Sequence, residues 1–94
     1  MKILCVCRKG NVRSVGMKWG LNERGYNDVL AVGSDLVSAS TLGMLCQWAD
    51  IILLAKKIHG ENIYPIYKDK INKHFYIGDD LEISVKKQLD AIGL

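Results

Sequence analysis

The chain has no long hydrophobic run, no strong excess of one charge and too few cysteines for a disulfide framework. Its apolar stretches are far shorter than the roughly 20 residues of a membrane-spanning helix, and the run near the first residue is too short and interrupted for a signal peptide. The net charge of +3 is mild and the basic residues are not gathered in one stripe, so neither a nucleic-acid nor a membrane partner is expected. Three cysteines cannot all pair, which favours a reducing cytoplasm and at least one free thiol.

Strand-like and helix-like segments alternate along the 94 residues, without an internal repeat, linker or low-complexity segment. Strands are expected at 2–7, 28–32, 50–54 and 74–77, and helices at 14–24, 40–48, about 56–67 and 81–92. This order predicts one α/β domain, residues 1–94, with a four-stranded parallel sheet between two layers of helices. Ligands of such sheets bind beyond the carboxyl ends of the strands, so a site is expected in the loops that follow them.

Particular residues are expected to set the ends and the packing of these helices. Ser14 is placed to cap the first helix and Gly25 to end it. Gly16 and Gly20, four residues apart, would let the same helix pack closely on the sheet. Pro65 is expected near the end of the third helix, as a breaker.

The most informative segment is the loop after the first strand, residues 7–14, which reads Cys-Arg-Lys-Gly-Asn-Val-Arg-Ser. A short buried strand, a tight loop and a helix start turn backbone N–H groups toward one point, which makes an anion site. The same positive field stabilises a thiolate, and it can lower the pKa of a thiol from about 8.5 to roughly 3.5–7.5. Arg13 can hold two phosphate oxygens through its planar guanidinium. The loop therefore indicates a nucleophile, Cys7, with its own phosphate cradle.

With these residues in view, the chain resembles the low-molecular-weight protein tyrosine phosphatase family, and it looks closest to the short bacterial and phage members. The resemblance covers most of the chain through the segments ILCVCRKGNVRS, AVGS, TLGMLCQWADIILLAKKIH and YIGDDLEI. The C-x5-R-S loop of that family maps onto Cys7, Arg13 and Ser14, and its late general acid maps onto Asp79. The resemblance implies a phosphatase-like fold and hydrolysis of a phosphorylated protein or small phosphomonoester without a cofactor, by a chain for which a monomer is favoured.

Three residues receive catalytic roles that their chemistry also allows. Cys7 would attack phosphorus and form a thiophosphate ester, which divides hydrolysis into two easier steps. Arg13 would follow the phosphoryl charge into the transition state, whereas an ordinary surface cation would be poorly placed at the positive end of a helix dipole. Asp79 would protonate the leaving oxygen and then activate water. Asp79 and Asp80 would equally suit a turn and a helix cap, with one acid and one cap as a natural division.

The rest of the loop is expected to bind phosphate or to shape the backbone. Ser14 would donate a hydrogen bond to the sulfur of Cys7, cap the helix, or do both. Glycine and asparagine tolerate left-handed backbone angles, which suits the middle of the loop. Arg8 and Lys9 either attract an acidic substrate or are solvated surface charges. The expected phosphate-binding residues are Arg8, Lys9, Gly10, Asn11, Val12, Arg13 and Ser14.

Other reactive or aromatic side chains are expected to be structural. Cys5 shares a strand face with Cys7 but does not lie at the end of the strand. It is therefore expected to be a buried core cysteine. His59 and His74 lack metal-ligand spacing with the cysteines, so no metal is expected and both are surface or packing residues. The larger aromatic side chains are expected mostly in the core or partly buried, with one of them available as a wall for a phosphotyrosine ring. They are Trp19, Trp48, Tyr64 and Tyr67.

Three alternatives to hydrolysis are open. A phosphocysteine carrier, like the B component of sugar phosphotransferase systems, also has a cysteine after its first strand, but Arg13 and a late aspartate favour hydrolysis. A non-catalytic phosphate-binding module is suggested by departures from the family: the Gly-Asn pair is one place later, Val15 and Asp80 replace prolines, and the chain is shorter. A thiol-linked arsenate reductase needs further cysteines near the first, and only Cys46 lies downstream.

Overall fold

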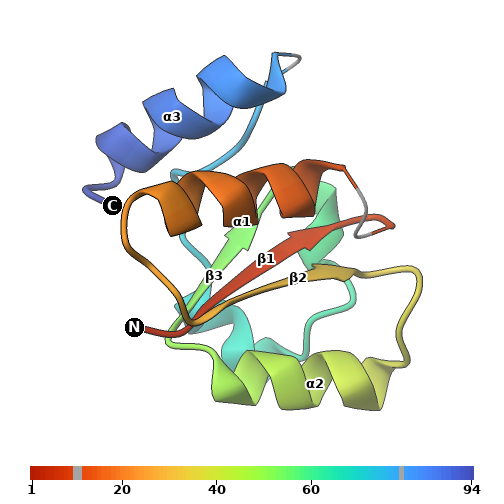
Figure 1. The fold of residues 1–94 in the computed structure, drawn as a ribbon. Coiled ribbons are helices and arrows are strands. Elements are labelled where there is room, and N and C mark those ends of the chain that lie inside the picture. Colours follow the sequence, from red (N-terminus) through yellow and green to blue (C-terminus); the bar gives the residue numbers. More distant parts are fainter. Residues whose placement is uncertain (10–11, 79) are drawn as a thin grey trace.

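Three parallel strands form the centre of the computed structural model, which describes residues 1–9, 12–78 and 80–94 (Figure 1). Strand β1 (Ile3–Cys7) lies between β2 (Val29–Gly33) and β3 (Ile51–Leu54), so the order is β2-β1-β3. All five residues of β1 are buried, as a central parallel strand covered on both faces requires. The parallel α/β architecture predicted from the alternating segments is therefore present, with three strands in the described sheet.

Helices cover both faces of this sheet. Helices α1 (Arg13–Glu23) and α3 (Leu81–Ala91) lie on one face and α2 (Ala39–Trp48) lies on the other (Figure 1). Two short 3-10 helices, η1 (Lys57–Gly60) and η2 (Pro65–Lys70), follow β3. In the described part of the chain, no helix is both long enough and apolar enough to cross a membrane.

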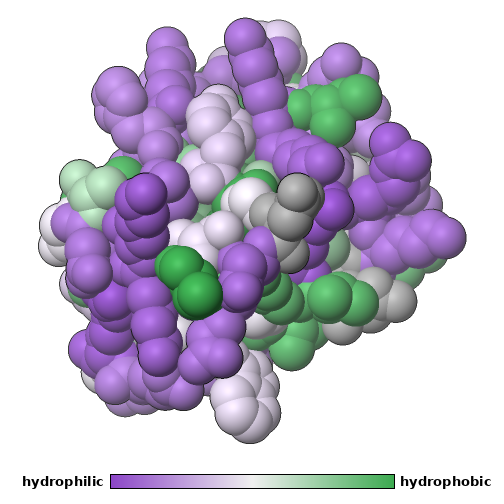
Figure 2. All heavy atoms as spheres, turned by 90° about the horizontal axis from the view of Figure 1, so that it is seen from above, coloured by the Kyte–Doolittle hydropathy of each residue, from purple (hydrophilic) through white to green (hydrophobic). Residues whose placement is uncertain are grey.

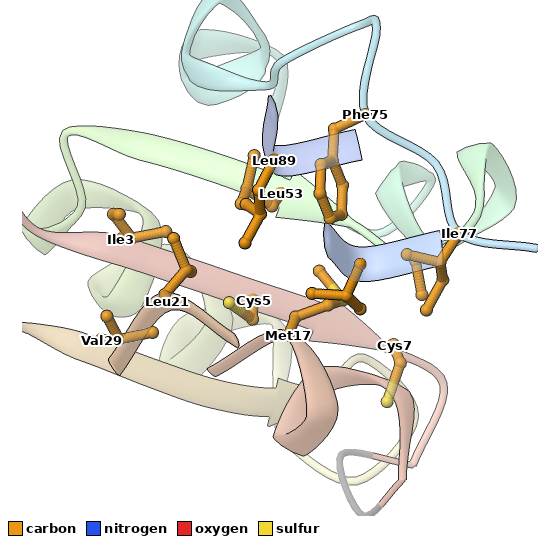
Figure 3. Close-up of a cluster of buried hydrophobic side chains, with 12 residues drawn as sticks. Ile3, Cys5, Cys7, Met17, Leu21, Val29, Leu53, Phe75, Ile77 and Leu89 are labelled. Atoms are coloured by element: carbon orange, nitrogen blue, oxygen red, sulfur yellow. The ribbon is translucent and has the colours of Figure 1, made fainter. Parts of the chain in front are cut away.

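The alternation of side chains along β1 creates two cores. Ile3, Cys5 and Cys7 point to the side of α1 and α3, where they pack in a cluster with Met17, Leu21, Phe75, Ile77, Val85 and Leu89 (Figure 3). Leu4 and Val6 point to the other side and pack with α2. Cys7 is thus a core residue at the last position of the central strand, where the chain leaves the sheet.

The predicted fourth strand at 74–77 is wrong for the described residues. The chain instead runs irregularly beside β3, with one bridge between Ile71 and Ile52 and a hydrogen bond from the Ile77 N–H to the Ala55 carbonyl, 3.1 Å long. Between these points the Asn72 carboxamide accepts the His74 N–H at 2.9 Å, which turns the backbone away from the ladder. The segment is held by burial of Phe75, which is fully enclosed in the core.

Some helix boundaries also differ from the sequence expectation. The helix expected at 56–67 is replaced by the two 3-10 helices, and Pro65 begins the second one at its first position, where the missing N–H has no intrahelical partner to lose. Helix α1 begins one residue earlier, at Arg13, so Ser14 lies inside it and makes no cap. Gly25 ends this helix as expected, with φ of 92° and N–H bonds of the kind that close a Schellman motif.

Gly16 and Gly20 bring α1 close to α3, which corrects the expectation that they pack on the sheet. A Cβ atom on Gly16 would lie 2.7 Å from Leu81, and one on Gly20 would lie 2.7 Å from Val85. Met17 and Leu21, one position further on, are fully buried in the core. The two helices therefore run parallel in a register of four residues, and Arg24 binds the Asp90 carboxylate at 2.7 Å one turn later.

Candidate active site around Cys7

The backbone carbonyl groups of Cys7 and Arg8 are hydrogen-bonded to the loop after β2. The Ser34 N–H donates to the Cys7 carbonyl at 2.8 Å, and the Asp35 N–H donates to the Arg8 carbonyl at 2.9 Å. These two bonds continue the parallel pairing of β1 with β2 beyond the strand ends, where Cys7 lies opposite Gly33. The sheet therefore holds the start of the loop rigidly at its carboxyl edge.

The sulfur of Cys7 is held at the first turn of α1. Its thiol donates to the hydroxyl of Ser14 across 3.1 Å, and Ser14 is completely buried. The predicted contact between Cys7 and Ser14 is present, but the thiol is the donor and the hydroxyl the acceptor, the reverse of the expected direction. The capping role expected of Ser14 is absent. Figure 3 shows Cys7 at the end of β1, beyond Cys5, in the cluster that also contains Ile77.

An open pocket of about 320 Å³ lies over Cys7. Its lining includes the N-cap and the first residue of α1, and the first N–H groups of a helix have no partner within the helix. Partial positive charge from the helix adds to the side-chain charge at this point. The pocket is lined by Cys7, Arg8, Lys9, Val12 and Arg13.

The cations at this pocket differ in their surroundings. Arg8 is exposed and lies 3.7 Å from the Asp35 carboxylate, a solvated contact of small energetic weight. Lys9 is exposed and Arg13 is half-buried. Among residues 1–9, 12–78 and 80–94, the ion pairs are those of Arg8, Arg24 and Lys86, so Arg13 keeps its charge available at the pocket.

His59 in η1 reports on this positive field. Its ring is buried, and Nδ1 accepts the Lys56 N–H at 3.1 Å, which leaves the proton of the neutral ring on Nε2. Burial lowers the pKa of His59, and the charges of Arg13, Arg8 and Lys56 lower it further, while Asp35 opposes them. The histidine therefore lies within electrostatic reach of the pocket. From the sequence, His59 was expected to be either a surface or a packing residue, so its burial was one of the two options. Its electrostatic interaction with the cations of the pocket was not predicted.

The two other cysteines are protected core residues. Burial, followed by the neighbouring Cys7, raises the pKa of Cys5 to about 12. Burial also raises the pKa of Cys46, which lies in the core on the opposite face of the sheet from Cys7. Cys5 is thus the buried core cysteine predicted from strand alternation, and the sheet separates Cys46 from the pocket.

The segment before α3 approaches the same core cluster from another direction. Gly78 donates its N–H to the Ser84 hydroxyl at 3.0 Å, and Asp80 accepts the Ile83 N–H at 3.1 Å as the N-cap of α3. Asp80 therefore takes the capping role that the sequence left open between the two aspartates. The predicted acid Asp79 lies outside the described residues, as do Gly10 and Asn11 of the predicted phosphate loop.

Residues beyond the loop also differ from expectation. Trp19 is 68% exposed and Tyr64 is 44% exposed, so both are more exposed than expected, whereas Trp48 and Tyr67 are partly buried against the core as expected. The predicted site did not include Ser34, Asp35 and His59, although Ser34 ends the AVGS segment through which the resemblance runs. In the described ranges, no group of three or more His, Cys, Asp or Glu residues is placed to hold a metal ion.

No protein-family model, curated protein or solved structure matches this chain significantly.

Proposed function

We propose that the chain is a cysteine-dependent phosphomonoester hydrolase that acts on phosphotyrosine. The observation that carries the proposal is the position of Cys7. It lines one pocket together with Arg13, and its sulfur lies 3.1 Å from the Ser14 hydroxyl. A nucleophile, a cation for the phosphoryl oxygens and a hydroxyl for the departing sulfur are the groups that this reaction needs. The resemblance to low-molecular-weight protein tyrosine phosphatases supports the same assignment.

In the first step, the Cys7 thiolate attacks phosphorus and the bond from phosphorus to the phenolic oxygen breaks. A sulfur–phosphorus bond forms, and the leaving oxygen takes a proton from Asp79, which is assigned this role by the resemblance. In the second step, water attacks the thiophosphate and gives its proton to the Asp79 carboxylate. Cys7 leaves as a thiolate, inorganic phosphate is released, and the Ser14 hydroxyl donates to the sulfur.

Charge at the pocket supports both steps. Arg13 extends from the first position of α1, so its guanidinium and the helix N-terminus act on the same anion. Arg8 and Lys9 add an exposed positive rim, which favours approach of a phosphate dianion. Electrostatic stabilisation by such fixed donors is commonly the largest single contribution to catalysis of this kind.

The position of Cys46 argues against a thiol-linked reductase. A resolving cysteine must reach the first sulfur, and Cys46 packs with Leu4 and Val6 on the other face of the sheet. A phosphocysteine carrier shares the nucleophile with a hydrolase and differs in the lifetime of the adduct. The two are separated by the rate at which phosphocysteine reacts with water.

The test is hydrolysis of p-nitrophenyl phosphate in the presence of a chelator. Turnover is expected in the wild type, loss to background in Cys7→Ser, and a loss of about 10²–10⁴-fold in Asp79→Asn. Cys46→Ala is the matched control, because it removes a buried thiol remote from the pocket, and it should keep turnover. Full activity in Cys7→Ser would overturn the proposal, and a long-lived phosphocysteine in the wild type would identify a carrier instead.

A further inference from the structure

A second and larger hollow lies on the surface between α1 and α3. Its volume is about 580 Å³, within the usual range for ligand sites. Figure 2 views the molecule from the side of α3 and shows hydrophobic side chains among mostly hydrophilic ones on this face. The apolar lining of the hollow, which we call the α1–α3 groove, consists of Val12, Val15, Gly16, Trp19, Gly20, Leu81 and Val85.

The groove forms because the close contact between α1 and α3 is made by small residues of α1, and the larger side chains of α1 lie beside that contact. Gly16 and Gly20 occupy the contact with α3, so their neighbours on α1 remain outside it. Trp19 is 68% exposed there, although indole is among the side chains that gain most from burial. On one rim Lys86 pairs with Glu82 at 3.4 Å, which gives the apolar groove a polar border. An apolar hollow with a polar border is typical of a binding surface.

The α1–α3 groove adjoins the pocket over Cys7. Val12 lines both, is 61% exposed, and lies next to Arg13 at the start of α1. One end of the combined surface is therefore cationic and the remainder is apolar. A ligand that suits both parts has an anionic group joined to an apolar body.

We propose that the α1–α3 groove binds an apolar side chain of the peptide that carries the phosphorylated residue. The proposal rests on the function proposed above. The groove follows α1 from its N-cap Val12 to Glu23 near its end, and 11 helical residues span about 16 Å. An extended peptide advances about 3.3 Å per residue, so the groove accommodates about five residues on one side of the phosphorylated one. The substrate class is thus a phosphopeptide with a hydrophobic residue within five positions of its phosphate.

The size of the groove favours a peptide over a second copy of this chain. A stable interface between copies buries about 800 Å² and roughly 20–30 residues on each partner. The α1–α3 groove is lined by ten residues, and its Val12 end adjoins the cationic pocket. An extended segment with a phosphate at one end occupies both parts at once.

The test uses phosphotyrosine peptides of serine and glycine that carry one leucine at each position from five before to five after the phosphorylated residue. In the wild type, kcat/KM is expected to rise about ten- to a hundredfold for leucine at positions on one side only, the effect of burying one aliphatic side chain. Trp19→Ala should reduce this preference to less than about threefold. Met44→Ala removes a similarly exposed apolar side chain from α2, on the opposite face, and should leave the preference unchanged.

Hydrolysis of p-nitrophenyl phosphate separates failure of this proposal from failure of the proposed function. An active wild type with equal kcat/KM for every peptide would overturn the groove proposal and leave the hydrolase standing. If the wild type hydrolyses nothing, binding is measured in Cys7→Ser with Trp48→Phe, where Trp19 is the remaining tryptophan. A blue shift of its emission with tighter binding of one leucine peptide supports the groove, and equal binding of all peptides overturns it. A wild-type dimer that Trp19→Ala dissociates would also overturn it, by showing that a second copy occupies the groove.

Discussion

Gly20 of α1 and Val85 of α3 are in direct contact, because a Cβ atom on Gly20 would lie 2.7 Å from Cγ1 of Val85. One turn earlier the same relationship links Gly16 and Leu81. This register places the start of α3 beside the start of α1. Helix α1 begins at the candidate phosphate loop, and α3 begins after Asp80. The contacts at the two glycines therefore fix the position of the start of α3 relative to the loop of the predicted nucleophile.

Gly20→Ala is expected to destabilise the protein although alanine is the better helix former. The gain in helix propensity is about 1 kcal/mol, whereas forcing a methyl group against a buried β-branched side chain costs about 1–3 kcal/mol. Val85 is 2% exposed and its χ1 is restricted, so it yields little. The free energy of unfolding, measured with urea, is therefore expected to fall by up to about 2 kcal/mol.

A double-mutant cycle with Val85→Ala separates this contact from other effects of Gly20→Ala. Val85→Ala alone opens a cavity and destabilises the protein. Combined with Gly20→Ala, it gives the new methyl group room, so the double variant should be more stable than the sum of the single changes implies. Strict additivity of the two changes would contradict the close contact.

Ser14→Ala should slow turnover of p-nitrophenyl phosphate more than it lowers stability. The Ser14 hydroxyl is the group next to the sulfur of Cys7, and under the proposed mechanism it stabilises the thiolate that leaves in the second step. A hydrogen bond to a charged group contributes about 1.5–3 kcal/mol, which corresponds to about a ten- to a hundredfold loss of kcat. The loss should fall on breakdown of the intermediate, so stopped-flow traces of Ser14→Ala should show a larger burst of nitrophenol before steady state.

Ser14→Thr is the matched control, because it keeps the hydroxyl and adds a methyl group. It should retain more activity than Ser14→Ala if the hydrogen bond is the cause. Equal activity of Ser14→Ala and the wild type would show that the hydroxyl has no part in the reaction.

Asp80→Ala should reduce stability and leave most of the activity. Its carboxylate accepts the Ile83 N–H as the N-cap of α3, and replacing such a cap with alanine costs about 0.5–2 kcal/mol. Asp79→Asn should have the opposite profile, with a large loss of kcat and little change in the free energy of unfolding. Thermal denaturation and p-nitrophenyl phosphate kinetics on both variants check the division. A large loss of kcat in Asp80→Ala alone would assign the acid to Asp80.

The central part of the fold was predictable because its signals are local. Continuous apolar runs at 2–7 and 50–54 identify strands buried on both faces, and Gly25 marks the end of α1 through a positive φ that suits glycine. The segment at 74–77 has the same apolar character, but its backbone is turned by the Asn72 side chain, and Phe75 is buried without joining the ladder. Such an outcome depends on a side-chain hydrogen bond and on core space, which periodicity does not record.

Of the candidate site, the residues that are close in sequence were predictable and those brought near by the fold were not. Cys7, Arg8, Lys9, Val12 and Arg13 are close in sequence, so one motif was enough to group them, and the structure places all five on one pocket. Asp35, after β2, pairs with Arg8, and His59, after β3, lies within electrostatic reach of Arg8 and Arg13. Their relation to Cys7 depends on the strand order β2-β1-β3, which sequence alone did not supply. The helix contact of Gly16 likewise depends on which layer α3 joins.

Stability is expected to fall as the pH is lowered below about 6.5, because His59 is buried in its neutral form. The pKa of His59 is lower in the folded state than in the unfolded state. At a pH below the pKa of the unfolded state, the unfolded chain therefore binds a proton at this histidine more readily than the folded chain does. The unfolded state then holds more protons, and the free energy of unfolding decreases as pH falls through this window, by at most about 1.4 kcal/mol per pH unit for one group. His59→Gln should remove this part of the pH dependence, whereas His74→Gln, a change at an exposed histidine, should retain it.

An anion in the pocket should raise the pKa of His59. Arg13 and Arg8 are two of the charges that lower it, and a bound dianion offsets both. Sulfate is a suitable probe because its charge is constant between about pH 5 and 8, and the titration of the His59 ring protons can be followed by NMR spectroscopy with and without it. Arg13→Ala should raise the pKa of His59 in the free protein and abolish the further rise with sulfate. Sulfate that binds at Arg13 without moving the His59 titration would show that the histidine is screened from the pocket.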